Sequence, residues 1–161
     1  MRLRRCAPAW LLAFVLAAGC SSTPPETLYS GYLSALNQAI RVENLLLFEA
    51  GKELPETDRR DYRTTFSAKE TRYVYAELRI RYPGPRERGA DLSVEWVWSD
   101  EAGGVIDRPT VESTIEAGWV RSVHVWGYGS EEAGGYWQPG TYRVSLYAGG
   151  ELLAAQTFRV E

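Results

Sequence analysis

The stretch RYVYAELRIRY, residues 72–82, decides the fold class of this chain. Every second residue from Val74 to Tyr82 is apolar. Alternation with a period of two is typical of a β-strand that buries one face and exposes the other. We therefore expect a half-buried strand. On its other face, Tyr73 and Tyr75 with Arg79 and Arg81 form a candidate binding patch, or else an ordinary solvated face that carries cross-strand pairs. That face carries Tyr73, Tyr75, Glu77, Arg79 and Arg81.

Other stretches repeat the pattern on both sides of this strand. In DLSVEWVW, residues 91–98, the alternate residues are Leu92, Val94, Trp96 and Trp98. In IRVENLLLF, residues 40–48, alternation places Ile40, Val42, Leu46 and Phe48 on one side, whereas the three consecutive leucines leave a helix open. TYRVSLY and ELLAAQTFRV flank Gly149-Gly150, which predicts a hairpin with a tight primed turn.

Glycine and proline lie in the gaps between these runs and not inside them. Residues 40–161 therefore read as seven or eight strands joined by short turns, with no helix-length pattern. This arrangement predicts an all-β, antiparallel sandwich. We expect its core to depend on Trp96, Leu78, Tyr142 and Val144.

The chain begins with Arg2, Arg4 and Arg5, followed by an apolar run from Ala9 to Ala18. About ten apolar residues are too few for a spanning helix, which needs roughly 20. A basic start, a short apolar middle and small residues at the end are typical of a secretory signal.

The end of this run, Leu16-Ala17-Ala18-Gly19-Cys20, resembles the lipobox of bacterial lipoproteins, although that family prefers leucine where Ala17 stands. The resemblance implies that residues 1–19 are removed and that Cys20 is acylated, which anchors the chain in a lipid bilayer. Ser21, in place of aspartate, implies an outer membrane site facing the periplasm. The alternative is an ordinary secretory signal with an incidental cysteine.

The residues after Cys20 change in character. Residues 20–27 are rich in serine, threonine and proline, which predicts an extended tether. Residues 28–39 space Leu28, Tyr32, Leu36 and Ala39 as a short helix would, although Gly31 weakens that pattern. The expected organisation is a signal, a tether, a helical segment and a sandwich.

The composition argues against several classes of partner. The chain has 18 basic and 21 acidic residues, and loss of the three signal arginines leaves 15 against 21, a charge of −6. Such a balance disfavours nucleic acid, which requires basic patches. The chain has two cysteines, Cys6 in the signal and Cys20 at the lipidation site, so no thiol remains for a disulfide.

Residues 40–161 resemble immunoglobulin-like domains. PGTYRVSLY resembles the strand that carries a tyrosine two residues before a cysteine, but Val144 stands at the cysteine position. Trp96 resembles the buried tryptophan of such domains, and Val74 or Ala76 would face the missing bridge. The segment from Trp137 to Val160 is similar to the closing hairpin of Ig-like modules in exported bacterial lipoproteins. The resemblance implies a fold, and no reaction.

A search for catalytic or metal-binding groups proposes no enzyme. His124 is the only histidine and lies in an alternating run, where a half-buried strand residue is expected rather than a metal ligand. No G-x-S-x-G nucleophile motif is present. We expect no catalytic residue, no cofactor and no metal.

The aromatic residues of WGYGSEEAGGYWQPG are the one functional indication. Trp126, Tyr128, Tyr136 and Trp137 surround a loop, where aromatic faces can stack on sugars or clamp an apolar peptide. The alternative is that they fill the open end of the sandwich. Two functions remain open: interaction with or scaffolding of an envelope protein, and binding of a glycan such as peptidoglycan.

Overall fold

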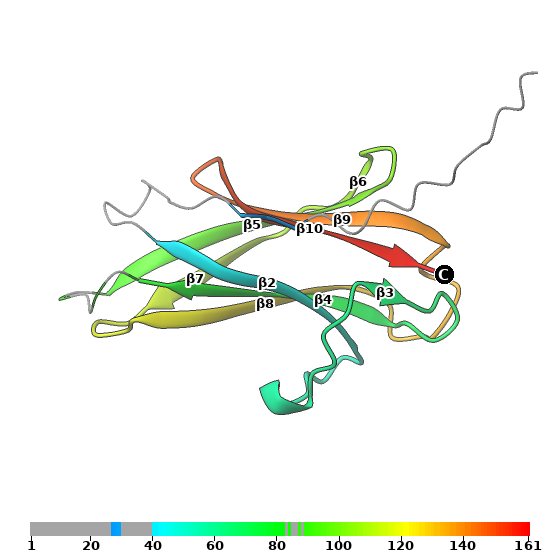
Figure 1. The fold of residues 1–161 in the computed structure, drawn as a ribbon, viewed down its shortest axis with the longest axis horizontal. Coiled ribbons are helices and arrows are strands. Elements are labelled where there is room, and N and C mark those ends of the chain that lie inside the picture. The colour runs from blue at the N-terminus through cyan, green and yellow to red at the C-terminus, as the bar shows by residue number, and fades with distance from the viewer. Residues whose placement is uncertain (1–26, 30–39, 83, 85–86, 88) are drawn as a thin grey trace, which may run out of the picture.

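The computed structural model describes residues 27–29, 40–82, 84, 87 and 89–161, with the backbone alone for 27–29. In this part of the chain two β-sheets pack face to face (Figure 1). The helical structure among these residues is a single 3-10 turn, η1, at Thr57–Arg59. None of their helices is long and apolar enough to cross a membrane. The predicted all-β sandwich is confirmed.

The smaller sheet contains three antiparallel strands in the order β2 (Arg41–Ala50), β4 (Tyr73–Arg81) and β8 (Arg121–Gly129). The larger sheet follows the order β1 (Thr27–Tyr29), β10 (Glu151–Val160), β9 (Gly140–Ala148), β5 (Ala90–Asp100) and β6 (Val105–Asp107). In the same sheet β7 (Thr110–Ile115) pairs with β5, and β3 (Thr65–Phe66) runs parallel to the end of β10.

The larger sheet has features of immunoglobulin-like sandwiches. Its neighbours β5, β9 and β10 correspond to the adjacent C, F and G strands of that fold. The Tyr142 hydroxyl donates a hydrogen bond to the Gln138 carbonyl oxygen at 2.9 Å, as in a tyrosine corner. Val144, at the position of the absent cysteine, lies opposite Trp98 on β5. The described residues include no cysteine, so no disulfide joins the two sheets among them.

The turn between β9 and β10 follows the sequence prediction. Ala148 lies opposite Glu151, which leaves Gly149 and Gly150 as a two-residue loop. Their φ angles are 57° and 81°, a region that favours glycine. The predicted primed turn is confirmed.

The core forms where the alternating faces of the two sheets meet. The predicted apolar faces of β4 and β5 are buried as expected, and Leu78, Trp96 and Val144 are at most 1% exposed. Tyr142 is half-buried and packs against the same cluster. The predicted core is therefore confirmed for three of these residues, with Tyr142 at its margin.

Strand β2 confirms the strand interpretation of residues 40–48 but corrects the faces. The pairing of β2 with β4 shifts by one residue between Val42 and Asn44. Such a bulge reverses which side chains point inward. Leu45 and Leu47 therefore enter the core, whereas Phe48 pairs with Tyr75 on the outer face. The prediction that Leu46 and Phe48 share a face with Ile40 and Val42 is wrong.

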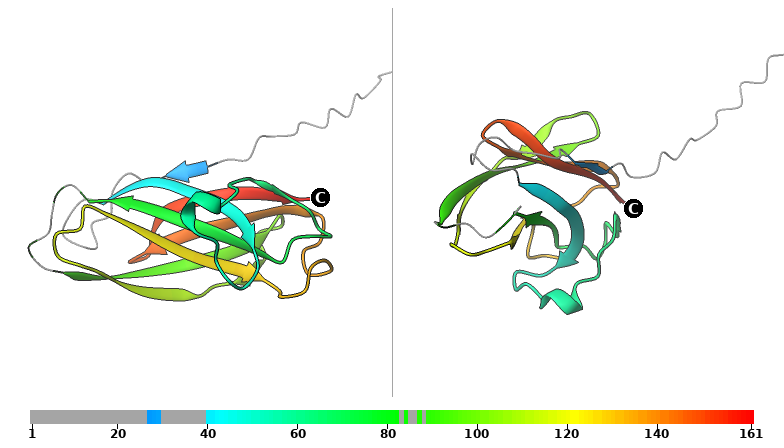
Figure 2. Two further views of the ribbon diagram at one scale, coloured as in Figure 1. Left: turned by 90° about the horizontal axis from the view of Figure 1, so that it is seen from below. Right: turned by 60° about the vertical axis from the view of Figure 1, so that its left-hand side comes forward.

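The outer face of the smaller sheet is partly covered, around Tyr75 and Glu77, contrary to the expectation of a solvated face. Figure 2 shows the segment between β2 and β4 lying on the side of this sheet away from the larger sheet. The Phe48 ring stacks on Tyr75 at 5.4 Å and meets the edge of Tyr62 at 5.8 Å. Tyr75 is only 9% exposed, so its prediction as part of a binding patch is wrong.

Glu77, also predicted to be solvated, is fully buried beneath this segment. Its carboxylate accepts hydrogen bonds from the guanidinium groups of Arg60 and Arg79 and from the Tyr62 hydroxyl, the latter two at 2.6 Å and 2.9 Å. Burial alone raises the pKa of Glu77, but the hydrogen bonds from Arg79, Arg60 and Tyr62 outweigh it and hold the pKa below its usual value. Residues 60–62 are thus held to the sheet by a buried ion cluster.

The N-terminal predictions lie mostly outside the described residues. Thr27–Tyr29 pair antiparallel with Ala154–Gln156 of β10, so the first two residues of the predicted helix 28–39 belong to a strand. Residues 30–39, the signal 1–19 and Cys20 lie outside the described residues.

We expect Trp96→Ala to lower the free energy of unfolding by about 3–5 kcal/mol, because a fully buried indole leaves a large cavity. Trp96→Phe should cost less, since it keeps a ring and removes an indole N–H that has no partner among the described residues. Urea denaturation measures both. A loss under about 1 kcal/mol for the alanine variant would contradict the core described here.

We expect Glu77→Gln to destabilise the protein by up to about 3–5 kcal/mol at neutral pH, because Arg60 and Arg79 lose their buried counter-charge. Since folding lowers the pKa of Glu77, its contribution is present above the unfolded pKa of about 4.3 and is lost as pH falls through the folded pKa. The gap between wild type and variant should close in acid. Glu131→Gln, at an exposed ion pair with Lys52, is the control and should have little effect.

Candidate functional site

The four candidate aromatic residues separate into buried and exposed pairs. Trp137 is 2% exposed, and its indole N–H donates to the Arg72 carbonyl oxygen at 3.1 Å. Tyr128 is half-buried and stacks on Trp98 at 6.1 Å. These two rings fill the end of the sandwich, as one of the two alternatives predicted.

Tyr136 and Trp126 remain exposed, at 40% and 37%. The Tyr136 ring meets the edges of Tyr128 and Trp137 at 5.5 Å and 5.8 Å. Burial raises the pKa of its hydroxyl, and the hydrogen bond with Tyr128 raises it further. Trp126 makes no ring contact within the described residues. The structure therefore brings the rings of Tyr128, Tyr136 and Trp137 into contact, whereas Trp126, two residues before Tyr128 on β8, does not join them.

Strand β8 is an edge of the smaller sheet. It pairs with β4 from Arg121 to Gly129, and no other described strand pairs with it. A nine-residue edge offers backbone N–H and C=O groups to another chain. The sequence predicted this strand, but not that it is an edge, because that depends on the order of distant strands.

The phase of the β4–β8 ladder tells which groups face outward. Tyr82 N–H donates to the Val120 carbonyl oxygen, and Ser130 N–H donates to that of Arg72, at 2.9 Å and 3.1 Å. Along a strand of an antiparallel pair, residues whose N–H and C=O groups bond to the partner strand alternate with residues whose N–H and C=O groups point away from it. The even-numbered residues of β8 therefore bond to β4. The backbone groups of Arg121, Val123, Val125 and Gly127 point to the open edge.

Apolar side chains accompany this edge. Val123 is 54% exposed, and Trp119 and Val120, immediately before β8, are 44% and 48% exposed. A shallow depression of about 560 Å³ is lined by residues 118–123. Trp126 adds an exposed indole farther along the strand. Exposed apolar residues beside an unpaired strand edge are typical of an interaction surface.

His124 lies on β8 but faces the interior between the sheets. Its Nε2 lies 2.7 Å from the Ser122 hydroxyl, and its Nδ1 lies 3.2 Å from the Ser113 hydroxyl of β7. Burial lowers the pKa of the imidazole, so the neutral ring joins β8 to the larger sheet at neutral pH. The predicted half-buried strand histidine is confirmed. No group of three or more metal-ligating side chains was found among the described residues.

The chain matches no protein-family model and no curated protein sequence. Among solved structures it is similar to the C-terminal domain of Wzt, at 9% identity and a TM-score of 0.46, covering 86% of this chain and 78% of that one.

It is also similar to part of a β-D-glucoside glucohydrolase of Trichoderma reesei, at 8% identity and a TM-score of 0.48, covering 77% of this chain and 19% of that chain. A third similar structure is the alkylpurine DNA glycosylase AlkC of Pseudomonas fluorescens, at 12% identity and a TM-score of 0.47, covering 76% of this chain and 30% of that chain. These likenesses concern a small β-sandwich and carry nothing about activity.

Proposed function

We propose that this protein is a non-catalytic envelope lipoprotein that binds another envelope protein through the open edge of β8. The observation that carries the proposal is the unpaired outer edge of a nine-residue strand, with Val123 and Trp126 exposed beside it. An extended segment of a partner can add to such an edge through main-chain hydrogen bonds, while alternate side chains give specificity.

The proposed anchor is acylated Cys20 in the outer membrane, facing the periplasm. Two or more acyl chains hold a protein stably in a bilayer, because each buried methylene contributes about 0.8 kcal/mol. Confinement near the membrane raises the effective concentration of partners held on the same surface. A modest affinity at β8 is then sufficient for association.

The second candidate function is glycan binding. Exposed Trp126 and Tyr136 favour it, since aromatic faces stack on sugar rings. Buried Trp137 and half-buried Tyr128 offer no such face. With two of the four rings engaged in packing, the strand edge is the better supported surface.

We expect Val123→Pro to abolish saturable binding of the full-length protein in detergent to solubilised envelope protein. Proline removes the Val123 N–H, which points to the open edge, and leaves the bonds to β4 intact. Val123→Thr, which keeps that N–H, is the matched control and should bind normally. Thermal denaturation should find both variants folded.

The glycan alternative is tested with isolated sacculi in the same assay. Retention on sacculi that is lost in Trp126→Ala and unchanged in Val123→Pro would replace the proposed function by glycan binding.

Metabolic labelling with palmitate tests the anchor. We expect the wild-type protein and Cys6→Ala to be labelled and Cys20→Ala to be unlabelled, since Cys20 would be the acylated residue. Label that persists in Cys20→Ala would contradict the lipoprotein assignment.

A further inference from the structure

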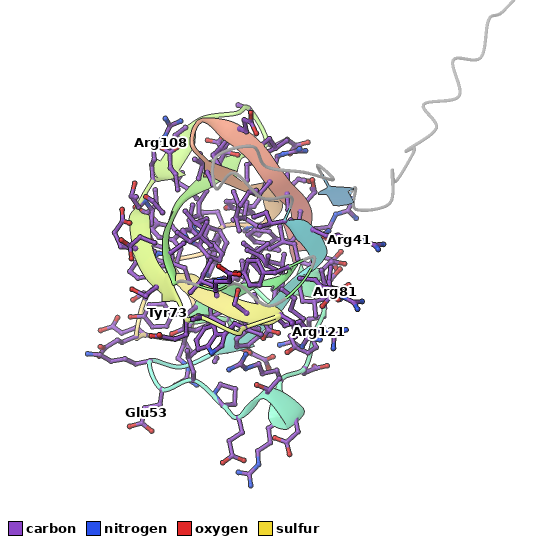
Figure 3. The ribbon with its side chains drawn as sticks, turned by 90° about the vertical axis from the view of Figure 1, so that its left-hand side faces the viewer. Arg41, Glu53, Tyr73, Arg81, Arg108 and Arg121 are labelled. Atoms are coloured by element: carbon purple, nitrogen blue, oxygen red, sulfur yellow. The ribbon has the colours of Figure 1, made fainter. Side chains whose placement is uncertain are left out.

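Three arginines form a row across the smaller sheet. Arg41 of β2 lies opposite Arg81 of β4, and Arg81 lies opposite Arg121 of β8. Directly opposed residues point to the same face of a sheet, and the neighbouring inward row is Val42, Ile80 and Ser122. The arginines therefore share the outer face. Figure 3 shows them one beside another at the same side of the molecule.

The row is exposed and incompletely neutralised. The side chains of Arg81 and Arg121 are 56% and 62% exposed. The Glu43 carboxylate lies 3.3 Å from the Arg121 guanidinium and 3.9 Å from that of Arg81. Arg41 forms no ion pair with a described residue. The row of three arginines thus has one carboxylate, which contacts two of them, in a chain whose net charge is −3.

Packing does not account for this arrangement. Like charges directly opposite one another destabilise a sheet. Two half-buried arginines nearby, Arg79 on this face and Arg60 in the segment that covers it, form ion pairs with the buried carboxylate of Glu77. A row of three arginines that is only partly neutralised creates a positive field beside the open edge, and such a field attracts anions.

The row continues onto the open edge. Arg121 is the first residue of β8, and its backbone groups point outward in the same phase as those of Val123. A strand added to β8 would lie about 4.8 Å away and would continue each row of the sheet. One of its side chains would lie beside Arg121, and the side chain two residues along would lie beside Val123.

We infer that the segment received by β8 is an acidic strand, with a carboxylate beside the arginine row and an apolar residue beside Val123. This inference rests on the proposed function and names the chemistry of the partner. A carboxylate suits the site, because guanidinium groups bind carboxylates through two parallel hydrogen bonds. The partner charge extends the row and neutralises it.

The experiment uses three synthetic peptides with the nine-residue length of β8. They share one alternating pattern that begins and ends with valine, and they differ at the first and last valine, which are replaced by glutamate, glutamine or lysine. In either strand direction, the replaced residue can then lie beside Arg121 while the next valine on the same face lies beside Val123. Fluorescence anisotropy measures their binding to the full-length protein in detergent. We expect the glutamate peptide to bind about tenfold tighter than the glutamine peptide, and the lysine peptide to bind weakest.

Arg121→Glu should abolish the preference for glutamate, as should high salt. Arg159→Glu makes the same charge change on β10, where Arg159 is 48% exposed, and should keep the preference. Val123→Pro should weaken all three peptides alike, because they share the edge.

Three other outcomes would contradict the inference, and each contradicts a different part of it. Equal binding of the glutamate and glutamine peptides, still lost in Val123→Pro, overturns the acidic partner and leaves the proposed function intact. Glutamate-dependent binding unaffected by Val123→Pro overturns the strand as occupant. If none of the peptides binds and the protein instead binds phosphatidylglycerol vesicles in an Arg121-dependent way, both the acidic strand and the proposed function are overturned. The arginine row would then contact a membrane surface.

Discussion

The small number of strands in one sheet determines what the rest of the molecule presents to solvent. With three strands, only β4 is paired on both sides, and β2 and β8 must both be edges. The edge of β2 is protected, because Phe48 bridges to Tyr62 and the Arg63 N–H donates to the Leu47 carbonyl oxygen at 2.9 Å. No described residue protects β8 in this way. Proteins normally protect their strand edges, and the proposed binding of another chain at β8 rests on this contrast.

The cover over β2 also explains why a charged residue is buried on the outer face of the smaller sheet. The segment between β2 and β4 returns across the sheet and brings Arg60 and Tyr62 onto Glu77. An ion cluster of this kind stabilises little by itself, since desolvation offsets much of the attraction. Its role is positional, because the segment that protects one edge can dock in only one place. The β2 edge of the sheet is therefore covered by a segment that the ion cluster holds in place, and the β8 edge is open among the described residues.

The sequence predicted what depends on neighbours along the chain and missed what depends on distant ones. Alternation in β4 and β5 and the positive φ angles of Gly149 and Gly150 are local, and both predictions were confirmed. The bulge in β2 reverses the faces of its second half, and nothing in the run of leucines indicates where the register shifts. The burial of Glu77 requires Arg60, which is 17 residues away. The candidate aromatics were found by composition, but which rings are buried depends on the packing of β9 and β10 beneath them.

The arginine row depends both on the local sequence and on the pairing of distant strands. Arg81 alone reads as one more charged residue on an alternating strand, and only the register places Arg41 and Arg121 beside it. Residues that oppose the local rules of a sheet tend to lie at functional sites, where another interaction offsets their cost. Here the mutual repulsion of the guanidinium groups is only partly offset by Glu43 in the free protein, and a second carboxylate would offset it further. Under the proposed binding, the three arginines that repel one another in the isolated sheet would favour its bound form, at the end of β8 where the backbone edge is also open.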